Sequence, residues 1–348
     1  MDAPAAAMIL GPLKLHTEIE QWKLAVPFRI TGLTRTAIEV LVVSLTKDGL
    51  TGHAEALGVR YHGENARSLQ AQVESLRPAI EAGVTPESLQ RMLPVGGARN
   101  GLDGALWDLA AKITGRSVWQ IAGLQSPRPV LNAFTCSADT PDNMAIAAVA
   151  YRGAKAIKLK LTGDQVDSER VRAVRAARSD VRLSVDANQG FTPDILAKLM
   201  PALVDAGVQL IEQPFPAEHD TWLDGFRSPI PFAADESVQG LADIERLAGR
   251  FKALNIKLDK CGGLTEALSM ARLARSLELE PWVGCMLGTS LAMAPAFIAG
   301  QLCTSVELDA PVFLQHDRGT TVVYEDGFVM CPQELWGSPA ACNPERGH

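Results

Sequence analysis

The chain has 348 residues, with 33 Lys and Arg against 40 Asp and Glu, which gives a formal net charge of −7. This acidic balance argues against a protein that binds a nucleic-acid backbone, since no local basic stripe offsets it. Hydrophobic residues at 47% and charged residues at 21% are ordinary for a folded globular protein and exclude a disordered chain.

The N-terminus and the cysteines favour a cytoplasmic location. The first residues lack the basic region of a signal peptide, and Lys14 and Glu18 interrupt the apolar run that follows. No stretch approaches the ~18 uninterrupted apolar residues of a membrane span. The six cysteines form no CxxC pair and no compact framework, as expected of reduced thiols. We therefore expect a cytoplasmic protein that binds neither membrane nor nucleic acid.

The first part of the chain, residues 1–120, is predicted to be a small α+β domain. Residues 37–45 and 51–56 are typical of strands, and Lys47-Asp48-Gly49 between them is typical of a hairpin turn. From residue 65 to residue 114 the apolar residues recur three or four apart, which indicates helices. A sheet followed by helices is therefore expected here.

After Pro129, short β-branched runs alternate with helical segments of about ten to fifteen residues. Eight such repeats favour a (β/α)8 barrel, a modified TIM barrel, over residues 121–325. A doubly wound open sheet is the alternative, but no Gly-x-Gly-x-x-Gly motif follows the first strand. The expected strands are residues 130–136, 156–161, 181–186, 209–213, 232–235, 254–258, 282–285 and 305–309.

One polar residue recurs near the end of each expected strand, 23 to 26 residues after the previous one. This interval is the length of one strand–helix unit. The C-terminal ends of all barrel strands open on one face, where barrel enzymes place their chemistry. Eight side chains remote in sequence are therefore expected to converge: Thr135, Lys160, Asp186, Glu212, Asp235, Lys260, Cys285 and Asp309.

Three consecutive repeats end in carboxylates, at Asp186, Glu212 and Asp235. Acids aimed at one point repel each other unless a cation lies between them. Because no His or Cys is among them, Mg²⁺ is the natural occupant, with Mn²⁺ as a substitute. The alternative is that each acid caps the helix that follows, but three acids at neighbouring strand ends favour the metal.

Lysines flank these acids. Lys158 and Lys160 are two residues apart in one strand, so both amines share the face that points into the barrel. Lys260 follows the sixth strand, which lies opposite the second strand in an eight-strand ring. We therefore expect one amine on each side of the metal, whereas a salt bridge is the favoured interpretation for Lys257.

This arrangement suggests a reaction at a carbon next to a carboxylate. Removal of that proton gives a dianionic enediolate, which a divalent cation stabilises. A lysine near a cation and a second amine loses proton affinity and can act as a base. With one base on each face, a proton leaves one side and returns on the other, so racemisation or epimerisation is the expected outcome.

These motifs resemble the enolase superfamily, in its muconate-lactonising subgroup. The similar segments are residues 158–160, 186–189, 212–214, 235–237 and 256–263, together with 27–29 and 98–109. The resemblance covers nearly the whole chain. It implies that residues 1–120 form a capping domain over the barrel, and residues 326–348 are expected to return towards that domain.

The resemblance also implies roles for individual residues. Asp186, Glu212 and Asp235 would hold Mg²⁺, as the superfamily's pattern of a lysine base with Mg²⁺ requires. Lys160 and Lys260 would be the opposed acid/base pair. Lys158, whose role as an ordinary salt bridge is the alternative, would contact the substrate carboxylate.

Within the subgroup, the segments around Thr135, Cys285 and Glu307-Leu308-Asp309 are similar to dipeptide epimerases of the L-Ala-D/L-Glu type. In those enzymes an Asp-x-Asp motif at the end of the eighth strand binds the α-ammonium group of the substrate. Glu307 replaces the first Asp here, and the i, i+2 spacing keeps both carboxylates on one strand face. Thr135, Cys285, Glu307 and Asp309 are therefore expected to bind substrate, together with Lys158.

The side chain of the epimerised residue is left open by the sequence. Some Ala-Glu epimerases carry an arginine in the capping loop that binds the glutamate side chain, and Leu33 stands at that place here. Arg29 and Arg35 lie nearby in sequence, but neither aligns with that arginine. An apolar side chain is therefore also plausible.

We expect a Mg²⁺-dependent isomerase, a dipeptide epimerase that inverts the α-carbon of the C-terminal residue by two-base 1,1-proton transfer. An N-acylamino-acid racemase or a cycloisomerase of the same superfamily is the alternative, although an acylated substrate has no ammonium group. A non-catalytic metal-binding barrel is the alternative from another class. The expected partner is a small dipeptide, and a homo-oligomer is a family-level expectation.

Overall fold

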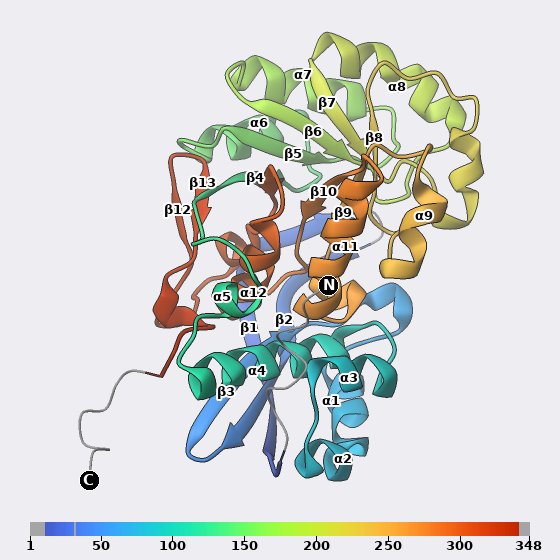
Figure 1. The fold of residues 1–348 in the computed structure, drawn as a ribbon. Helices are drawn as coiled ribbons and strands as arrows, with labels where there is room; N and C mark the ends of the chain where they lie inside the picture. The colour runs from blue at the N-terminus through green and yellow to red at the C-terminus, as the bar shows by residue number, and fades with distance from the viewer. Residues whose placement is uncertain (1–10, 31–32, 341–348) are drawn as a thin grey trace.

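The computed structural model describes residues 11–30 and 33–340, in which a three-stranded sheet with helices adjoins a barrel (Figure 1). The sheet is antiparallel, in the order β1 (Lys14–Ile30), β2 (Leu33–Lys47) and β3 (Leu50–Ala56). The predicted hairpin is confirmed as β2 and β3. Strand β1 was not predicted, although the buried Leu13 and Leu15 alternate with the exposed Lys14 and His16 near its start.

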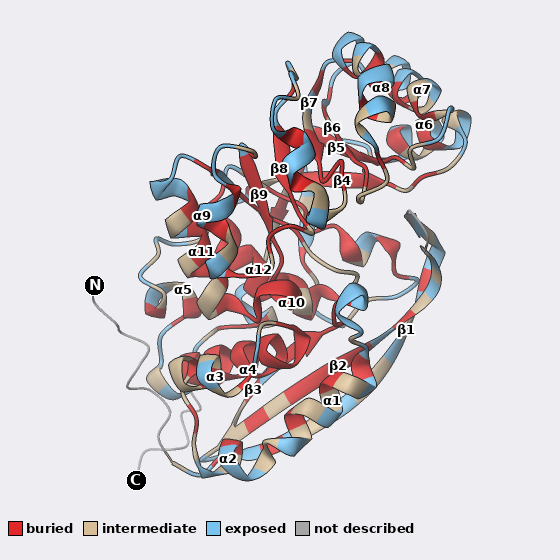
Figure 2. Cartoon of the chain, turned by 90° about the vertical axis from the view of Figure 1, so that its right-hand side faces the viewer, coloured by how far each residue is buried: buried red, intermediate tan, exposed pale blue. Residues whose placement is uncertain are grey.

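The predicted helical region is confirmed. It contains α1 (Ala66–Ser75), α2 (Arg77–Ala82), α3 (Pro86–Met92) and α4 (Gly97–Thr114), followed by the short α5 (Val118–Ile121). Helix α4 is buried from Gly97 to Ala111, as its mostly red ribbon shows (Figure 2). A Cβ at Gly52 of β3 would lie 2.2 Å from the carbonyl oxygen of Ala105, so only glycine allows this close approach. Helix α4 therefore packs directly on the sheet.

Eight parallel strands form the barrel. Each pairs with the next in sequence, and the last pairs with the first, which closes the ring and excludes the open sheet. The strands are β4 (Val130–Cys136), β5 (Ala156–Lys160), β6 (Arg182–Asp186), β7 (Val208–Glu212), β8 (Phe232–Ala234), β9 (Ala253–Ile256), β10 (Glu280–Val283) and β11 (Ser305–Val306).

Long helices follow most of the strands, as predicted: α6 (Pro141–Ala150), α7 (Asp167–Ala177), α8 (Pro193–Asp205), α11 (Leu264–Ser276) and α12 (Ser290–Gly300). The prediction is wrong for two units. A 3₁₀ helix (Ala217–Leu223) follows β7, and only a 3₁₀ turn (Leu241–Asp243) and α9 (Ile244–Leu247) follow β8. Prolines at positions 214, 216, 229 and 231 explain the first case, since proline breaks helices.

The eighth strand is also shorter than predicted. It ends at Val306, and Asp309 begins a 3₁₀ helix (Ala310–Phe313), because the proline at position 311 suits a helical start and cannot continue the ladder. A hairpin of β12 (Val323–Glu325) and β13 (Phe328–Met330) then joins β4 in antiparallel pairing, so it spans the expected division at residue 325.

The last described residues lie against the first sheet and α4. After a 3₁₀ turn (Gln333–Leu335), the Trp336 indole donates to the His53 carbonyl at 2.9 Å, and the Gly337 amide donates to Asp108 at 2.9 Å. None of the helices in the described part of the chain combines the length and the apolar composition that a membrane span requires.

Candidate active site

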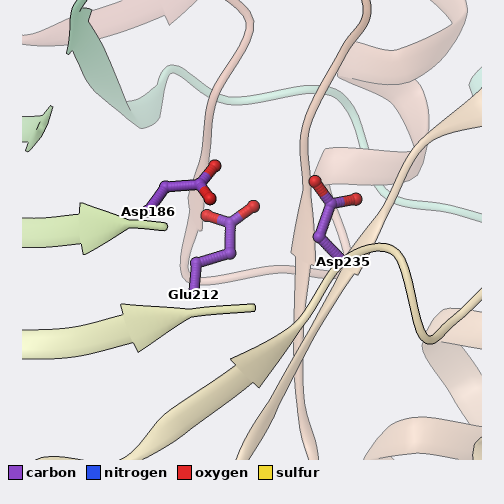
Figure 3. A group of neighbouring side chains, drawn as sticks. All are labelled: Asp186, Glu212 and Asp235. Atoms are coloured by element: carbon purple, nitrogen blue, oxygen red, sulfur yellow. The ribbon is translucent and has the colours of Figure 1, made fainter. Parts of the chain in front are cut away.

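Three carboxylates converge at the C-terminal ends of neighbouring barrel strands (Figure 3). Asp186 ends β6, Glu212 ends β7, and Asp235 directly follows β8. Each offers one oxygen to a group whose oxygens all lie within 4.8 Å of one another, and all three side chains are buried. An all-oxygen donor set of this kind fits a hard cation such as Mg²⁺.

Strand β5 brings two amines to one side of this group. The Lys160 Nζ lies 2.6 Å from Asp186. The Lys158 Nζ lies 3.3 Å from Asp186, 3.0 Å from Glu212 and 2.5 Å from Glu307. Burial opposes the charge of Lys158, but its three carboxylate neighbours outweigh burial and hold its pKa well above the usual value. Lys158 therefore stays charged.

Two further amines approach Asp235 from the opposite side of the ring. The Lys257 Nζ lies 2.7 Å from one carboxylate oxygen, and the Lys260 Nζ lies 2.5 Å from the other. Lys260 belongs to a one-turn helix, α10 (Leu258–Cys261), and also donates to the Asn255 carbonyl at 3.0 Å. Burial lowers the pKa of Lys260 despite the Asp235 charge.

The carboxylates of the site shift the pKa values of one another. Burial and the Asp186 charge raise the pKa of Glu212 to about 7. Burial and the Asp235 charge raise the pKa of Glu236 to about 8. Burial also raises the pKa of Asp186, but Lys160 and Lys158 outweigh it and bring the value below normal. Such opposite shifts among neighbouring buried acids are typical of functional sites.

A second carboxylate pair follows β11. Thr135, near the end of β4, donates through its hydroxyl to Glu307 at 2.8 Å and through its amide to Asp309 at 2.6 Å. Burial and the Glu307 charge raise the pKa of Asp309 to about 6. The threonine thus fixes the two predicted acids side by side, and a cation placed between them would relieve their repulsion.

A cavity of about 420 Å³ connects both acid groups to the N-terminal region. Its barrel wall includes Thr135, Lys158, Lys160, Asp235, Cys285, Glu307 and Asp309. Its other wall comes from the segment after β3 and the β1–β2 hairpin, and includes Phe28, Arg35, Leu57, Gly58, Arg60 and Tyr61. The N-terminal sheet region therefore closes over the mouth of the barrel.

Two guanidinium groups line the outer wall of this cavity, Arg35 and Arg60. Burial and the charge of Arg60 lower the pKa of Arg35, and the described residues provide neither group with an ion pair. Arg29 instead binds Asp139 at 3.2 Å. Leu33 is the first residue of β2, but its side chain falls outside the described part of the chain, so the expectation about it has no structural outcome.

Sequence patterns missed several groups at this site. Asn255 of β9 donates to Glu212 at 2.7 Å, and its two-residue spacing from Lys257, which directly follows β9, could have placed it on the inner face. Glu236 accepts from Asn188 at 3.3 Å and has a second buried oxygen without a hydrogen bond among the described residues. Arg60 lies in a 3₁₀ turn (Arg60–His62), where no periodicity marks a cavity wall.

Two family models match this chain. The model described as enolase C-terminal domain-like matches residues 143–335. The model of the mandelate racemase / muconate lactonizing enzyme N-terminal domain matches residues 13–123. Together they cover most of the sequence.

Two characterised relatives extend over most of the chain. The L-Ala-D/L-Glu epimerase of Escherichia coli (strain K12) is 41% identical over 310 residues, which cover 88% of this chain and 96% of that protein. The N-acetyl-D-glutamate racemase of a Pseudoalteromonas species is 37% identical over 310 residues, which cover 88% of this chain and 97% of that protein.

Solved structures show the same fold. One is an enolase family member from Agrobacterium tumefaciens with homology to dipeptide epimerases, bound to sodium and L-Ala-L-Glu. It has a TM-score of 0.90 and 38% sequence identity, and the match covers 94% of this chain and 100% of that one. Another is a dipeptide epimerase from Methylococcus capsulatus, complexed with Mg and L-Arg-D-Lys. It has a TM-score of 0.84 and 29% sequence identity, and the match covers 93% of this chain and 97% of that one. The chain therefore belongs to the mandelate racemase / muconate lactonizing enzyme group of the enolase superfamily.

Proposed function

We propose that this protein is a dipeptide epimerase that inverts the α-carbon of the C-terminal residue by two-base proton transfer. One observation carries the proposal: Lys160 and Lys260 come from opposite sides of the ring, and each binds a different carboxylate of the same three-acid group. A substrate held at those acids would have one amine on each face of its α-carbon.

The charges of the site support a divalent cation. Asp186, Glu212 and Asp235 are buried and hold their ligand oxygens within 4.8 Å of one another, so a cation between them would relieve their mutual repulsion. Held by Asp186, Glu212 and Asp235, Mg²⁺ would bind the substrate carboxylate and stabilise the charge that develops on it. Mn²⁺ would substitute for it.

The lysines have two different roles, proton transfer and binding of the substrate carboxylate. Lys160 and Lys260 exchange protons with the two faces of the α-carbon, one as base and the other as acid. Lys158, which stays charged between Glu212 and Glu307, donates hydrogen bonds to the substrate carboxylate. In the reverse direction the two catalytic lysines exchange roles.

The two ends of the substrate meet different walls of the cavity. Glu307 and Asp309, oriented by Thr135, accept the N-terminal ammonium group, and Cys285 packs beside them. The C-terminal side chain would extend towards Arg35 and Arg60, whose guanidinium groups suit an acidic side chain. A dipeptide ending in glutamate or aspartate is therefore the proposed substrate.

An N-acylamino-acid racemase is the second candidate, because a racemase of N-acetyl-D-glutamate is among the relatives. The two candidates differ at Asp309, since an acylated substrate has no charge for it to bind. If the protein is a dipeptide epimerase, Asp309→Asn lowers kcat/KM for a free dipeptide by about tenfold more than for its N-acetylated form. Equal losses for both substrates would favour the racemase.

Exchange of α-protons in D₂O across a library of dipeptides tests the proposal as a whole. Deuterium marks the position that becomes acidic, whatever the side chain. We expect incorporation at the C-terminal α-carbon of L,L and L,D dipeptides, fastest with acidic side chains. Absence of incorporation into every dipeptide, in the presence of Mg²⁺, would refute the proposed function.

A further inference from the structure

The helix that carries Lys260 contacts the N-terminal domain directly. Helix α10 spans only Leu258–Cys261; its Asp259 side chain binds the segment after β3, and its Cys261 carbonyl accepts from Arg99 of helix α4. Lys160, in contrast, is the last residue of strand β5 and is paired with Asp186 of β6 in the barrel ladder. The two proposed bases are thus held by different parts of the molecule.

Asp259, the neighbour of Lys260, provides one of these contacts. Its buried carboxylate accepts hydrogen bonds from the backbone amides of Leu57 at 3.0 Å and Gly58 at 3.3 Å. These amides begin the segment that carries Arg60 and Tyr61 along the outer cavity wall. One side chain therefore connects the base-bearing helix to the wall of the substrate cavity.

The N-terminal domain also contacts the C-terminal end of α10. Gly262 and Gly263 have positive φ angles of 80° and 116°, which glycine alone adopts without strain. A Cβ on Gly262 would lie 2.2 Å from the Arg99 side chain, and one on Gly263 would lie 2.5 Å from Asp103. Arg99 also donates to the Cys261 carbonyl at 2.6 Å. Helix α10 is therefore enclosed by the N-terminal domain at both ends.

A short helix has little stability of its own, so its position depends on these contacts. The Lys260 amine must lie within hydrogen-bonding distance of the proton that it transfers, and small displacements of such a group lower its rate. Lys160 has the strand ladder as its support and does not depend on Asp259.

We infer that Asp259 is a positioning residue that couples the cavity segment 57–61 to Lys260, and that its loss impairs the Lys260 half-reaction selectively. This inference rests on the proposed function. Each epimer loses its α-proton to one lysine, so the exchange rates of the two epimers in D₂O report on the two lysines separately.

The experiment compares Asp259→Ala with Asp259→Asn in the full-length protein with Mg²⁺. Lys160→Ala and Lys260→Ala first establish which epimer each lysine serves. We expect Asp259→Ala to lower the Lys260-dependent exchange by about tenfold or more relative to the Lys160-dependent exchange. Asp259→Asn keeps an oxygen that can accept from both amides, so it should restore most of the lost rate.

Asp108→Ala is the matched control. Asp108 is also buried and also accepts from two backbone amides, those of His53 and Gly337, both at 2.9 Å, but it does not touch α10. Its loss should lower stability and leave the ratio of the two exchange rates unchanged. Equal losses of both rates in Asp259→Ala, or an unchanged ratio, would overturn the inference.

Backbone hydrogen exchange provides a readout that needs no substrate. Asp259→Ala should increase the exchange of amides in residues 257–263, whereas Asp108→Ala should not. If wild-type protein exchanges no dipeptide proton, the proposed function fails. If it does and either the ratio or the amide exchange fails to respond to Asp259→Ala, the inference alone fails.

Discussion

Strand β5 and helix α10 present the same functional group to one site by different means. Lys160 ends a strand that is paired on both sides within the barrel, whereas Lys260 lies on a single helical turn between Asp235 and the N-terminal domain. The ladder of β5 would keep its geometry without a neighbouring domain. Helix α10 would not, so under the proposed function one base would be positioned by the barrel alone and the other only together with the N-terminal domain.

The largest expected effect is the loss of either amine. Lys160→Ala and Lys260→Ala should each lower the epimerisation rate by about 100- to 10,000-fold, because each removes one general acid/base. The rate is measured from the optical rotation of a single dipeptide epimer. Lys155→Ala, at an exposed lysine that pairs with Asp326 and lies over the Phe328 ring, is the control and should retain the full rate. Near-normal epimerisation by either catalytic-site variant would contradict two-base transfer.

The two sides of the acid group can be compared through metal affinity. Asp186→Asn, on the β5 side, and Asp235→Asn, on the α10 side, should each weaken Mg²⁺ binding by about 100-fold or more, since even outer partners of metal ligands contribute 10- to 100-fold. Isothermal titration of the purified variants measures this without any assay of activity. Unchanged affinity in one variant would remove that carboxylate from the metal site.

The contribution of the N-terminal domain to specificity should be smaller. Arg35→Leu and Arg60→Leu should each lower kcat/KM for dipeptides ending in glutamate by about 10- to 100-fold, because a charged hydrogen bond is lost. Dipeptides ending in leucine should react as well as before or better. Arg29→Leu is the matched control, since Arg29 is bound to Asp139. Parallel losses for acidic and apolar substrates would show that these arginines do not select the side chain.

The smallest effect on the reaction is expected at the interface between α4 and the start of α11, where the pH dependence of stability is the measured quantity. Burial raises the pKa of Asp103 to about 7, although Thr265 donates to it, whereas an unfolded aspartate titrates near 4. The neutral acid is therefore favoured in the folded state. The associated stability is complete below about pH 4 and is lost as the pH rises to about 7.

Asp103→Asn removes this titration and keeps the shape of the side chain. The stability of the variant relative to wild type should therefore increase between pH 4 and pH 7 and stay constant above pH 8. Melting temperatures of both proteins across this range provide the comparison. A constant difference, or one that decreases with pH, would show that Asp103 stays charged in the folded protein.

Much of the site could be predicted because strand ends obey simple rules. The alternation of Lys158 and Lys160 with aliphatic residues placed both amines inside the barrel, and they lie there. The regular interval between Asp186, Glu212 and Asp235 placed them at one end of neighbouring strands, where they converge. Local periodicity and the repeat length were sufficient for these residues.

Contacts between the two parts of the molecule could not be predicted in this way. Asp259 lies 202 residues from Leu57, and no periodicity relates two segments so distant in sequence. Arg60 follows the end of β3 in an irregular turn, and its position at the cavity depends on how the N-terminal domain docks. Strand β1, in contrast, could have been predicted near its start, where the buried Leu13 and Leu15 flank the exposed Lys14.

The stereochemistry of α-proton exchange tests the central claim most directly. Lys160→Ala and Lys260→Ala are each incubated in D₂O with Mg²⁺ and with one epimer of an acidic dipeptide at a time, and deuterium at the α-carbon is measured by NMR. We predict a reciprocal result, in which each variant still exchanges the proton of one epimer and the two variants retain opposite epimers. Loss of exchange with the same epimer in both variants would mean that both amines act on one face of the substrate, and would contradict the account.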